Sequence, residues 1–212
     1  MPGRRRQKRT ERSKIDATPP WETRARDDVP PTTGPYDERD APEDELTRLD
    51  LGALRIPVGP GYDVRVDLNE AQQVMSATLA GPDGTMQLGV FAAPRNEGIW
   101  DEVRAEIAAS MNAQRKASAT EAEGPFGAEL RGTVPADTGR GTVPVRFLGV
   151  DGPRWFLRAL LAGPVASDPV KAKTFEDAFR RVVVVRGAEP LPVRDAVPLQ
   201  LPDDIELPSS ES

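Results

Sequence analysis

The sequence predicts an α+β domain in which a single, mostly antiparallel sheet of about six to seven strands carries two main helices. Three observations support this fold class. The apolar period switches repeatedly between two and about 3.6 residues along the middle of the chain, which indicates strands interspersed with helices. Most connections between successive strands are too short for parallel crossovers. The chain ends are polar and rich in proline, so we expect one globular unit at residues 47–201.

Three strands and a helix are expected in the first half of this unit. Residues 62–68, 73–80 and 84–92 alternate between apolar and polar side chains, as half-buried strands do. The tetrapeptide Gly81-Pro82-Asp83-Gly84 supplies the turn between the last two strands. A helix follows, with Asn96 as its expected N-cap and an apolar stripe formed by Trp100, Val103, Ile107 and Met111.

Two hairpins are expected next. Residues 128–135 and 141–150 form the first, around Thr138-Gly139-Arg140. In the second, Asp151-Gly152 precedes a strand at residues 153–162, and Asp-Gly is favoured in a two-residue type I′ turn. That turn predicts a register in which Phe147 faces Phe156, Leu148 faces Trp155 and Gly149 faces Arg154.

A second helix and a short buried strand complete the domain. Asp168 is the expected N-cap, Pro169 takes the first helical position, and Phe175, Ala178, Phe179 and Val182 face the core. Residues 182–185 are four consecutive valines and are typical of a buried strand. Strands 143–150 and 153–162 are apolar on both sides, so an alternative arrangement places helices on both faces of the sheet.

The composition argues against most enzyme classes. The sequence contains no histidine and no cysteine, which removes the usual neutral-pH base, the thiolate nucleophile and most transition-metal ligands. The sequence contains no P-loop, no GxSxG motif and no EF-hand loop. We therefore expect no cofactor and no metal. We therefore interpret the protein as non-enzymatic.

An enzyme using carboxylate or Ser/Lys chemistry is the remaining catalytic alternative. Its lysines would be Lys116, Lys171 or Lys173, which lie near expected helix ends where solvated lysines are usual. Its carboxylates would come from the first helix, where Asp101, Glu102 and Glu106 lie on the polar side. The simpler interpretation is that these three residues form a solvated helix face.

Both ends of the chain are expected to be disordered tails. Residues 1–14 carry seven Lys or Arg and one Glu, residues 15–46 are acidic and proline-rich, and residues 202–212 are acidic. No apolar segment follows the basic run, and the longest apolar run, at residues 159–166, is too short to span a membrane. We expect a cytosolic protein.

The basic tail suggests a second function, that of a nucleic-acid-associated accessory protein. Anionic lipid and the acidic segment of the same chain are further candidate partners of this tail. The contacts would be electrostatic and would come from Arg4, Arg5, Arg6, Lys8 and Arg9.

A candidate binding site lies on the strand at residues 153–162. Alternation places Arg154, Phe156 and Arg158 on one face, with Gly149 opposite Arg154. Two arginines beside an aromatic ring suit a carboxylate, a phosphate or an acidic partner peptide. The alternative is that both arginines simply pack their stems over Phe147 and Phe156.

Several motifs together resemble an actinobacterial family catalogued only as a domain of unknown function. They are RLDLGALRIP (48–57), FAAPR (91–95), WDEVRAEI (100–107), GPFGAEL (124–130), VRFLGVDGPRWFLR (145–158) and VVVVRG (182–187). The resemblance implies a cytosolic protein of this architecture, and it assigns no activity, cofactor or catalytic residue. Our leading hypothesis is a non-enzymatic interaction module that engages an as yet unknown protein partner.

Overall fold

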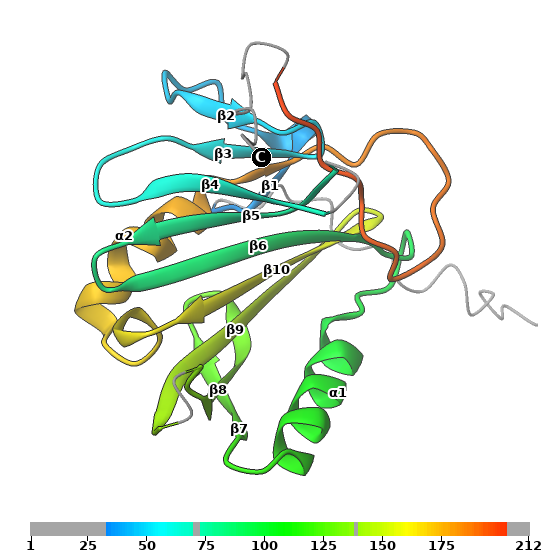
Figure 1. Ribbon diagram of the computed structural model, residues 1–212. Helices are drawn as coiled ribbons and strands as arrows, with labels where there is room; N and C mark the ends of the chain where they lie inside the picture. Colours follow the sequence, from blue (N-terminus) through cyan, green and yellow to red (C-terminus); the bar gives the residue numbers. More distant parts are fainter. Residues whose placement is uncertain (1–32, 70–72, 138–139, 203–212) are drawn as a thin grey trace, which may run out of the picture.

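The computed structural model describes residues 33–69, 73–137 and 140–202 (Figure 1). In this part of the chain, seven antiparallel strands form the main sheet. Their spatial order is β4 (Asp63–Leu68), β5 (Val74–Gly81), β6 (Gly84–Ala92), β10 (Trp155–Ala162), β9 (Thr142–Gly152), β8 (Gly127–Pro135) and β7 (Ser118–Gly124). The α+β class and the antiparallel pairing are confirmed.

A second sheet shows that the expectation of a single sheet was wrong. Its four short strands run in the order β1 (Tyr36–Asp37), β11 (Val183–Val184), β3 (Leu54–Pro57) and β2 (Arg48–Asp50). β1 and β11 are parallel, while the other two pairs are antiparallel. The predicted strand at 182–185 exists as β11, but it belongs to this smaller sheet.

The two helices lie on opposite faces of the main sheet, as the alternative arrangement proposed. α1 (Trp100–Ala113) packs on one face, where Trp100 stacks on Phe156 at 5.6 Å between ring centroids. α2 (Pro169–Arg180) packs on the other face, where Phe175 and Phe179 share the principal core with β10 and the small sheet. Alternate residues of β10 therefore enter two different cores.

Residues 33–46 differ from the expected continuation of the N-terminal tail, because they contain β1 and the 3₁₀ helix η1 (Glu38–Asp40). The amide of Tyr36 donates to the carbonyl of Val182 at 2.9 Å. The buried carboxylate of Asp37 accepts a hydrogen bond from Trp155 Nε1 at 2.8 Å. These long-range contacts offset the ordering entropy that the local composition alone cannot.

The register predicted for the β9–β10 hairpin was wrong. Gly152 pairs with Trp155, so the turn residues are Pro153 and Arg154, and Arg154 adopts a φ of 64°. Proline fixes φ near −65° and suits the first central position of a turn whose second position has positive φ. As a result, Phe147 faces Leu160, Leu148 faces Ala159 and Gly149 faces Arg158.

The start of α1 also differs from the prediction. Asn96 does not cap this helix, which begins at Trp100. The carboxylate of Asp151, at the end of β9, accepts hydrogen bonds from the amides of Ile99 (2.8 Å) and Trp100 (3.3 Å). A residue distant in sequence thus supplies both the cap and a negative charge at the N-terminus of the helix.

The start of α2 follows the prediction closely. Asp168 accepts a hydrogen bond from the amide of Val170 at 2.9 Å, and Pro169 is the first helical residue. The predicted core residues Phe175, Ala178 and Phe179 are buried. The 3₁₀ helix η2 (Pro164–Ala166) connects β10 to this helix. Neither helix in the described part of the chain has the length and apolarity needed to cross a membrane.

Candidate anion site on the open sheet face

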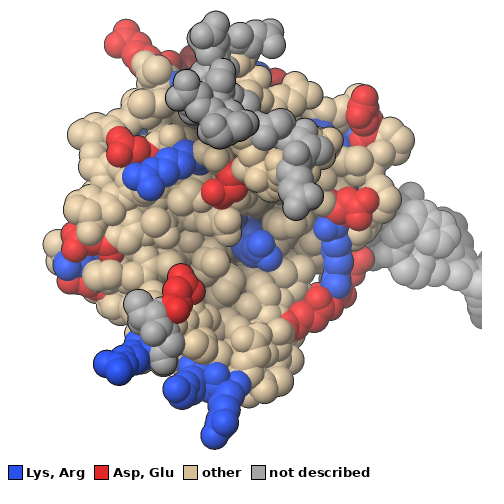
Figure 2. Space-filling model, viewed as in Figure 1, with Lys and Arg blue, Asp and Glu red and all other residues tan. Residues whose placement is uncertain are grey.

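One half of the α1-bearing face of the main sheet is left open by the helix. α1 contacts chiefly β7, β8 and β9 and reaches β10 through Trp100, so β4, β5, β6 and the rest of β10 carry no helix on this side. Figure 2 views this face and shows a basic group over β6 and β10, with an acidic group close above it and largely uncharged surface on the other sides. This open half of the sheet is accessible to a ligand.

Arg158 lies at the centre of the open half. Its neighbours on the adjacent strands are Gly89 of β6 and Gly149 of β9, and the rings of Phe91 and Trp100 fill the space over these glycines. Its guanidinium lies over the ring of Phe91, 5.0 Å from the centroid. Arg158 is half-buried and has neither a hydrogen bond nor an ion pair to any described residue.

Arg158 is partly removed from water and has no anionic partner among the described residues, and this combination sets the pKa of its side chain. Desolvation lowers the pKa of its guanidinium, and no neighbouring charge contributes. The group nevertheless stays cationic at neutral pH, because the arginine pKa lies far above 7. A half-buried cation without a counterion is unfavourable, and an anion would restore the lost interactions with water. The arrangement can therefore bind an anion.

Asp67 forms the second polar feature of the same face. Its Oδ2 accepts hydrogen bonds from Ser76 Oγ (2.5 Å), Thr78 Oγ1 (3.0 Å) and Gln87 Nε2 (3.4 Å). These donors, Ser76 foremost, lower the pKa of Asp67 against the opposing effect of burial. All three hydrogen bonds go to Oδ2. The other carboxylate oxygen, Oδ1, accepts none from the described residues and could accept one from a ligand.

Removing the main donor should raise the pKa of Asp67. In Ser76→Ala, the carboxylate loses its shortest hydrogen bond, so its titration should shift upward from the depressed value towards that of an unperturbed Asp. Side-chain carboxyl NMR of Asp67 as a function of pH measures both values. The same titration in Ser118→Ala, a strand serine on β7, serves as the control, and an unchanged pKa in Ser76→Ala would contradict the network.

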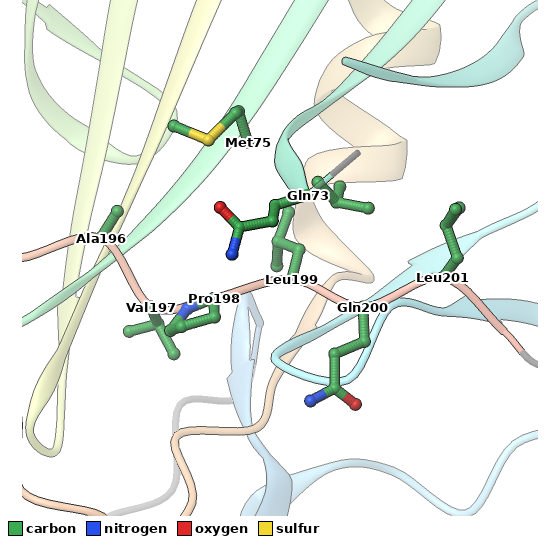
Figure 3. Close-up of a pocket in the computed structure, with 9 residues that line it drawn as sticks. Gln73, Met75, Ala196, Val197, Pro198, Leu199, Gln200 and Leu201 are labelled. Atoms are coloured by element: carbon green, nitrogen blue, oxygen red, sulfur yellow. The ribbon is translucent and has the colours of Figure 1, made fainter. Parts of the chain in front are cut away.

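A pocket adjoins the open face at the start of β5. Its volume is about 550 Å³, and its lining comprises Gln73, Val74, Met75 and the strap segment Ala196–Leu201. In Figure 3, the side chain of Met75 extends towards Ala196 on the strap. Ala196 forms an antiparallel bridge with Phe91, which places the pocket next to the ring that carries Arg158.

A protein-family model described as "Protein of unknown function (DUF3710)" matches residues 34–207. The chain belongs to this family. Membership agrees with the expected resemblance to a domain family of unknown function. A search of curated proteins found no match to this DUF3710 member.

Two solved structures are similar to this DUF3710 member only at a distant level. A crystal structure from Bacteroides thetaiotaomicron has 11% identity and a TM-score of 0.43, covering 69% of this chain and 52% of its own. The crystal structure of LpqN, involved in cell envelope biogenesis of Mycobacterium tuberculosis, has 12% identity and a TM-score of 0.38, covering 72% and 99%. This chain thus spans about half the length of the first structure.

The structure separates the three site residues predicted for this DUF3710 domain. Arg158 lies on the open face, whereas Phe156 is 1% exposed and sits between Phe91 and Trp100. Arg154 occupies the hairpin turn, where its carbonyl accepts from Arg186 Nε at 3.0 Å. Arg154 therefore does not share a site with Arg158. The tail contacts predicted for Arg4, Arg5, Arg6, Lys8 and Arg9 lie outside the described residues.

Two features of the candidate site were not predicted from the sequence. Phe91 supports Arg158 from β6, and its alternation within residues 84–92 could have placed it on this face once the strand order was known. The strap could not be anticipated, because its short alternating run contains Pro198 and its isolated bridges, from Leu199 to β5 and from Ala196 to β6, join segments far apart in the sequence.

The acidic residues weighed for catalysis, together with Lys171 and Lys173, make surface ion pairs. Arg194 of the strap region pairs with Glu102 at 2.7 Å and Glu106 at 2.8 Å, both on α1. Lys171 pairs with Asp83 and Lys173 with Asp177, each at 2.6 Å. In the described ranges, no three acidic side chains come together in a way that could hold a metal ion.

Proposed function

We propose that this DUF3710 member is a non-enzymatic, cytosolic protein-interaction module. It binds a carboxylate-bearing segment of a protein partner on the open sheet face, with Arg158 as the anchor. The observation that carries this proposal is a half-buried guanidinium without a hydrogen bond or ion pair to any described residue. An acidic partner residue would supply the missing charge and hydrogen bonds.

The surroundings of Arg158 support an anchoring role. The guanidinium makes a cation–π contact with the Phe91 ring, and none of its N–H groups donates a hydrogen bond to a described residue, so they are available to a bidentate anion. The Phe91 ring fills the space over Gly89 and the Trp100 ring fills the space over Gly149, so an aromatic ring borders the arginine on each side. Restricting the arginine in this way lowers the entropy lost on binding.

The adjoining pocket supports binding more than catalysis. Its lining residues are apolar or carry amides, and none has an ionisable side chain. Acid–base chemistry would need at least one titratable group within reach of a substrate. A pocket of this kind instead suits an apolar group of a partner.

Arg158→Gln should weaken binding of an acidic probe. The full chain would be titrated with a fluorescein-labelled hexaglutamate peptide at low salt, followed by anisotropy. Loss of a charge-assisted, bidentate contact should raise Kd at least about tenfold. Arg39→Gln removes the same charge from η1, where the arginine is exposed, and should change Kd less than about twofold.

Equal weakening by both variants would mean that the probe senses only net charge. That result would contradict the assignment of Arg158 as the anchor, as would undiminished binding by Arg158→Gln.

A further inference from the structure

We infer that the partner segment is amphipathic, with an apolar side chain that enters the pocket beside Met75 while a nearby carboxylate binds Arg158. This inference rests on the proposed function and assigns it a recognition motif. The occupant is therefore a partner peptide that combines one acidic and one apolar residue at short spacing.

The two halves of the site face the same side of the sheet. Phe91 carries the Arg158 guanidinium, and its antiparallel bridge partner is Ala196 of the pocket lining. Bridge partners in an antiparallel pair point to the same face. Val197 and Leu199 are buried in the principal core, so Ala196 and Pro198, which alternate with them, face outward. The cation and the pocket thus border one continuous surface.

The pocket is apolar on the side that faces the open sheet. Met75 is 55% exposed, which is unusual for a large apolar side chain. Met75 lies where the β4–β5 register shifts between Asp67 and Leu68, opposite Ser76 and Val74, so it has no partner residue on β4. A bulge residue of this kind is directed away from the regular pairing and lines the pocket.

The spacing of the site defines the spacing in the peptide. Arg158 and Ala196 lie on opposite sides of β6, opposite Gly89 and Phe91, so two strand spacings and two residues along the strand separate their backbones by roughly 12 Å. The guanidinium reaches over Phe91 towards the strap, which shortens the span between the two binding groups. Alternate residues of an extended peptide project to the same side roughly 7 Å apart. An acidic residue and an apolar residue at positions i and i+2 therefore fit.

Charge complementarity favours a partner over an apolar ligand alone. Arg158 contributes an uncompensated positive charge at one end of the surface, and the other end has no ionisable lining residue. A purely apolar ligand would cover the guanidinium without pairing it, which is unfavourable. A purely acidic ligand would leave Met75 exposed to water.

Three capped peptides test this inference on the full chain. The first is acetyl-Gly-Asp-Gly-Leu-Gly-amide, the second has Ser in place of Leu, and the third has Asn in place of Asp. Binding is followed by backbone amide NMR. The Leu peptide should bind about tenfold more tightly than the Ser peptide, because it buries an apolar side chain. The Asn peptide should bind at least about tenfold more weakly than the Leu peptide.

Met75→Ser should abolish the preference for Leu over Ser, while Arg158→Gln should weaken both acidic peptides. Val170→Ser is the matched control, because Val170 is 83% exposed on α2, away from this face, and the preference should survive there. Equal binding of the Leu and Ser peptides that still depends on Arg158 would overturn the inference and leave the proposed function intact. Binding that does not depend on Arg158, or no binding at all, would overturn both.

Other occupants would give different results. If peptide binding emerges only after deletion of residues 203–212, the pocket belongs to the chain's own end and the partner assignment fails. A dimer in sedimentation that Met75→Ser dissociates would equally overturn it in favour of a second copy.

Discussion

Arg146→Ala should lower the free energy of unfolding by about 3–5 kcal/mol, the range found when one member of a buried ion pair is removed. Arg146 is 4% exposed and Glu129 is 1% exposed, beneath α2. Arg146 donates from Nε to Glu129 Oε1 at 2.9 Å and from Nη2 to Oε2 at 2.7 Å. Its Nη1 donates to Glu176 of α2 at 2.6 Å.

The large effect is expected because Arg146→Ala leaves the buried Glu129 carboxylate without its main partner. Burial acts to lower the pKa of Arg146, and the bonds to Glu129 and Glu176 outweigh it and raise the pKa. In Arg146→Ala, the Glu129 carboxylate loses its two bonds to Arg146 and remains in a site from which water is largely excluded. The link between β9 and α2 through Glu176 is lost as well. Urea unfolding followed by tryptophan fluorescence measures the change.

Arg131→Ala is the matched control for this prediction. Arg131 also bonds Glu129, at 2.7 Å, but its side chain is 53% exposed, so its loss should cost only about 0–1 kcal/mol. A double variant, Arg146→Met with Glu129→Leu, should be less destabilised than the sum of the two single variants. Similar small losses for Arg146→Ala and Arg131→Ala would show that the buried pair does not hold α2 to the sheet.

Trp100→Ala should destabilise the protein by about 3–5 kcal/mol, as expected for truncation of a large buried aromatic side chain. Trp100 is 6% exposed and stacks on Phe156. Its ring occupies the space above Gly149, where an added Cβ would lie 2.2 Å from Trp100 Cδ2. Only Trp100 and Met111 are buried within α1, so the attachment of this helix depends strongly on one residue.

Trp100→Phe separates packing from hydrogen bonding. Trp100 Nε1 donates to the carbonyl of Ala128 at 2.7 Å, and phenylalanine keeps an aromatic ring but loses this bond. The expected loss is about 1–3 kcal/mol, because the Ala128 carbonyl is left without its partner in a half-buried position. Thermal unfolding followed by circular dichroism compares both variants. If Trp100→Ala were no less stable than Trp100→Phe, the ring would not anchor α1.

Local signals in the sequence were sufficient for much of the fold. Alternation located β4, β5 and β6, and the Asp168-Pro169 pair marked the start of α2 because both act within one helical turn. Even the wrong hairpin register left Arg158 on the correct face. The true register is displaced by an even number of residues, and such a shift preserves the alternation of faces.

Long-range features were beyond the reach of the sequence. The small sheet consists of strands of two to four residues that pair across most of the chain, too short to show a period. The cap of α1 comes from Asp151, fifty-one residues beyond Trp100, so the local Asn96 could not be excluded. Arg158 was singled out by residue type, but its support by Phe91 and its lack of a counterion depend on strand order.

The central claim, that Arg158 binds a carboxylate, can be tested by observing its guanidinium directly. The Nε–H resonance of Arg158, assigned by comparison with Arg158→Gln, would be followed by side-chain ¹⁵N NMR while the capped Leu peptide is added to the full chain. A saturable shift of this resonance is predicted, with the Nε–H of Arg146, already paired with Glu129, unchanged. A resonance of Arg158 that stays fixed while backbone amides elsewhere report binding would contradict the account.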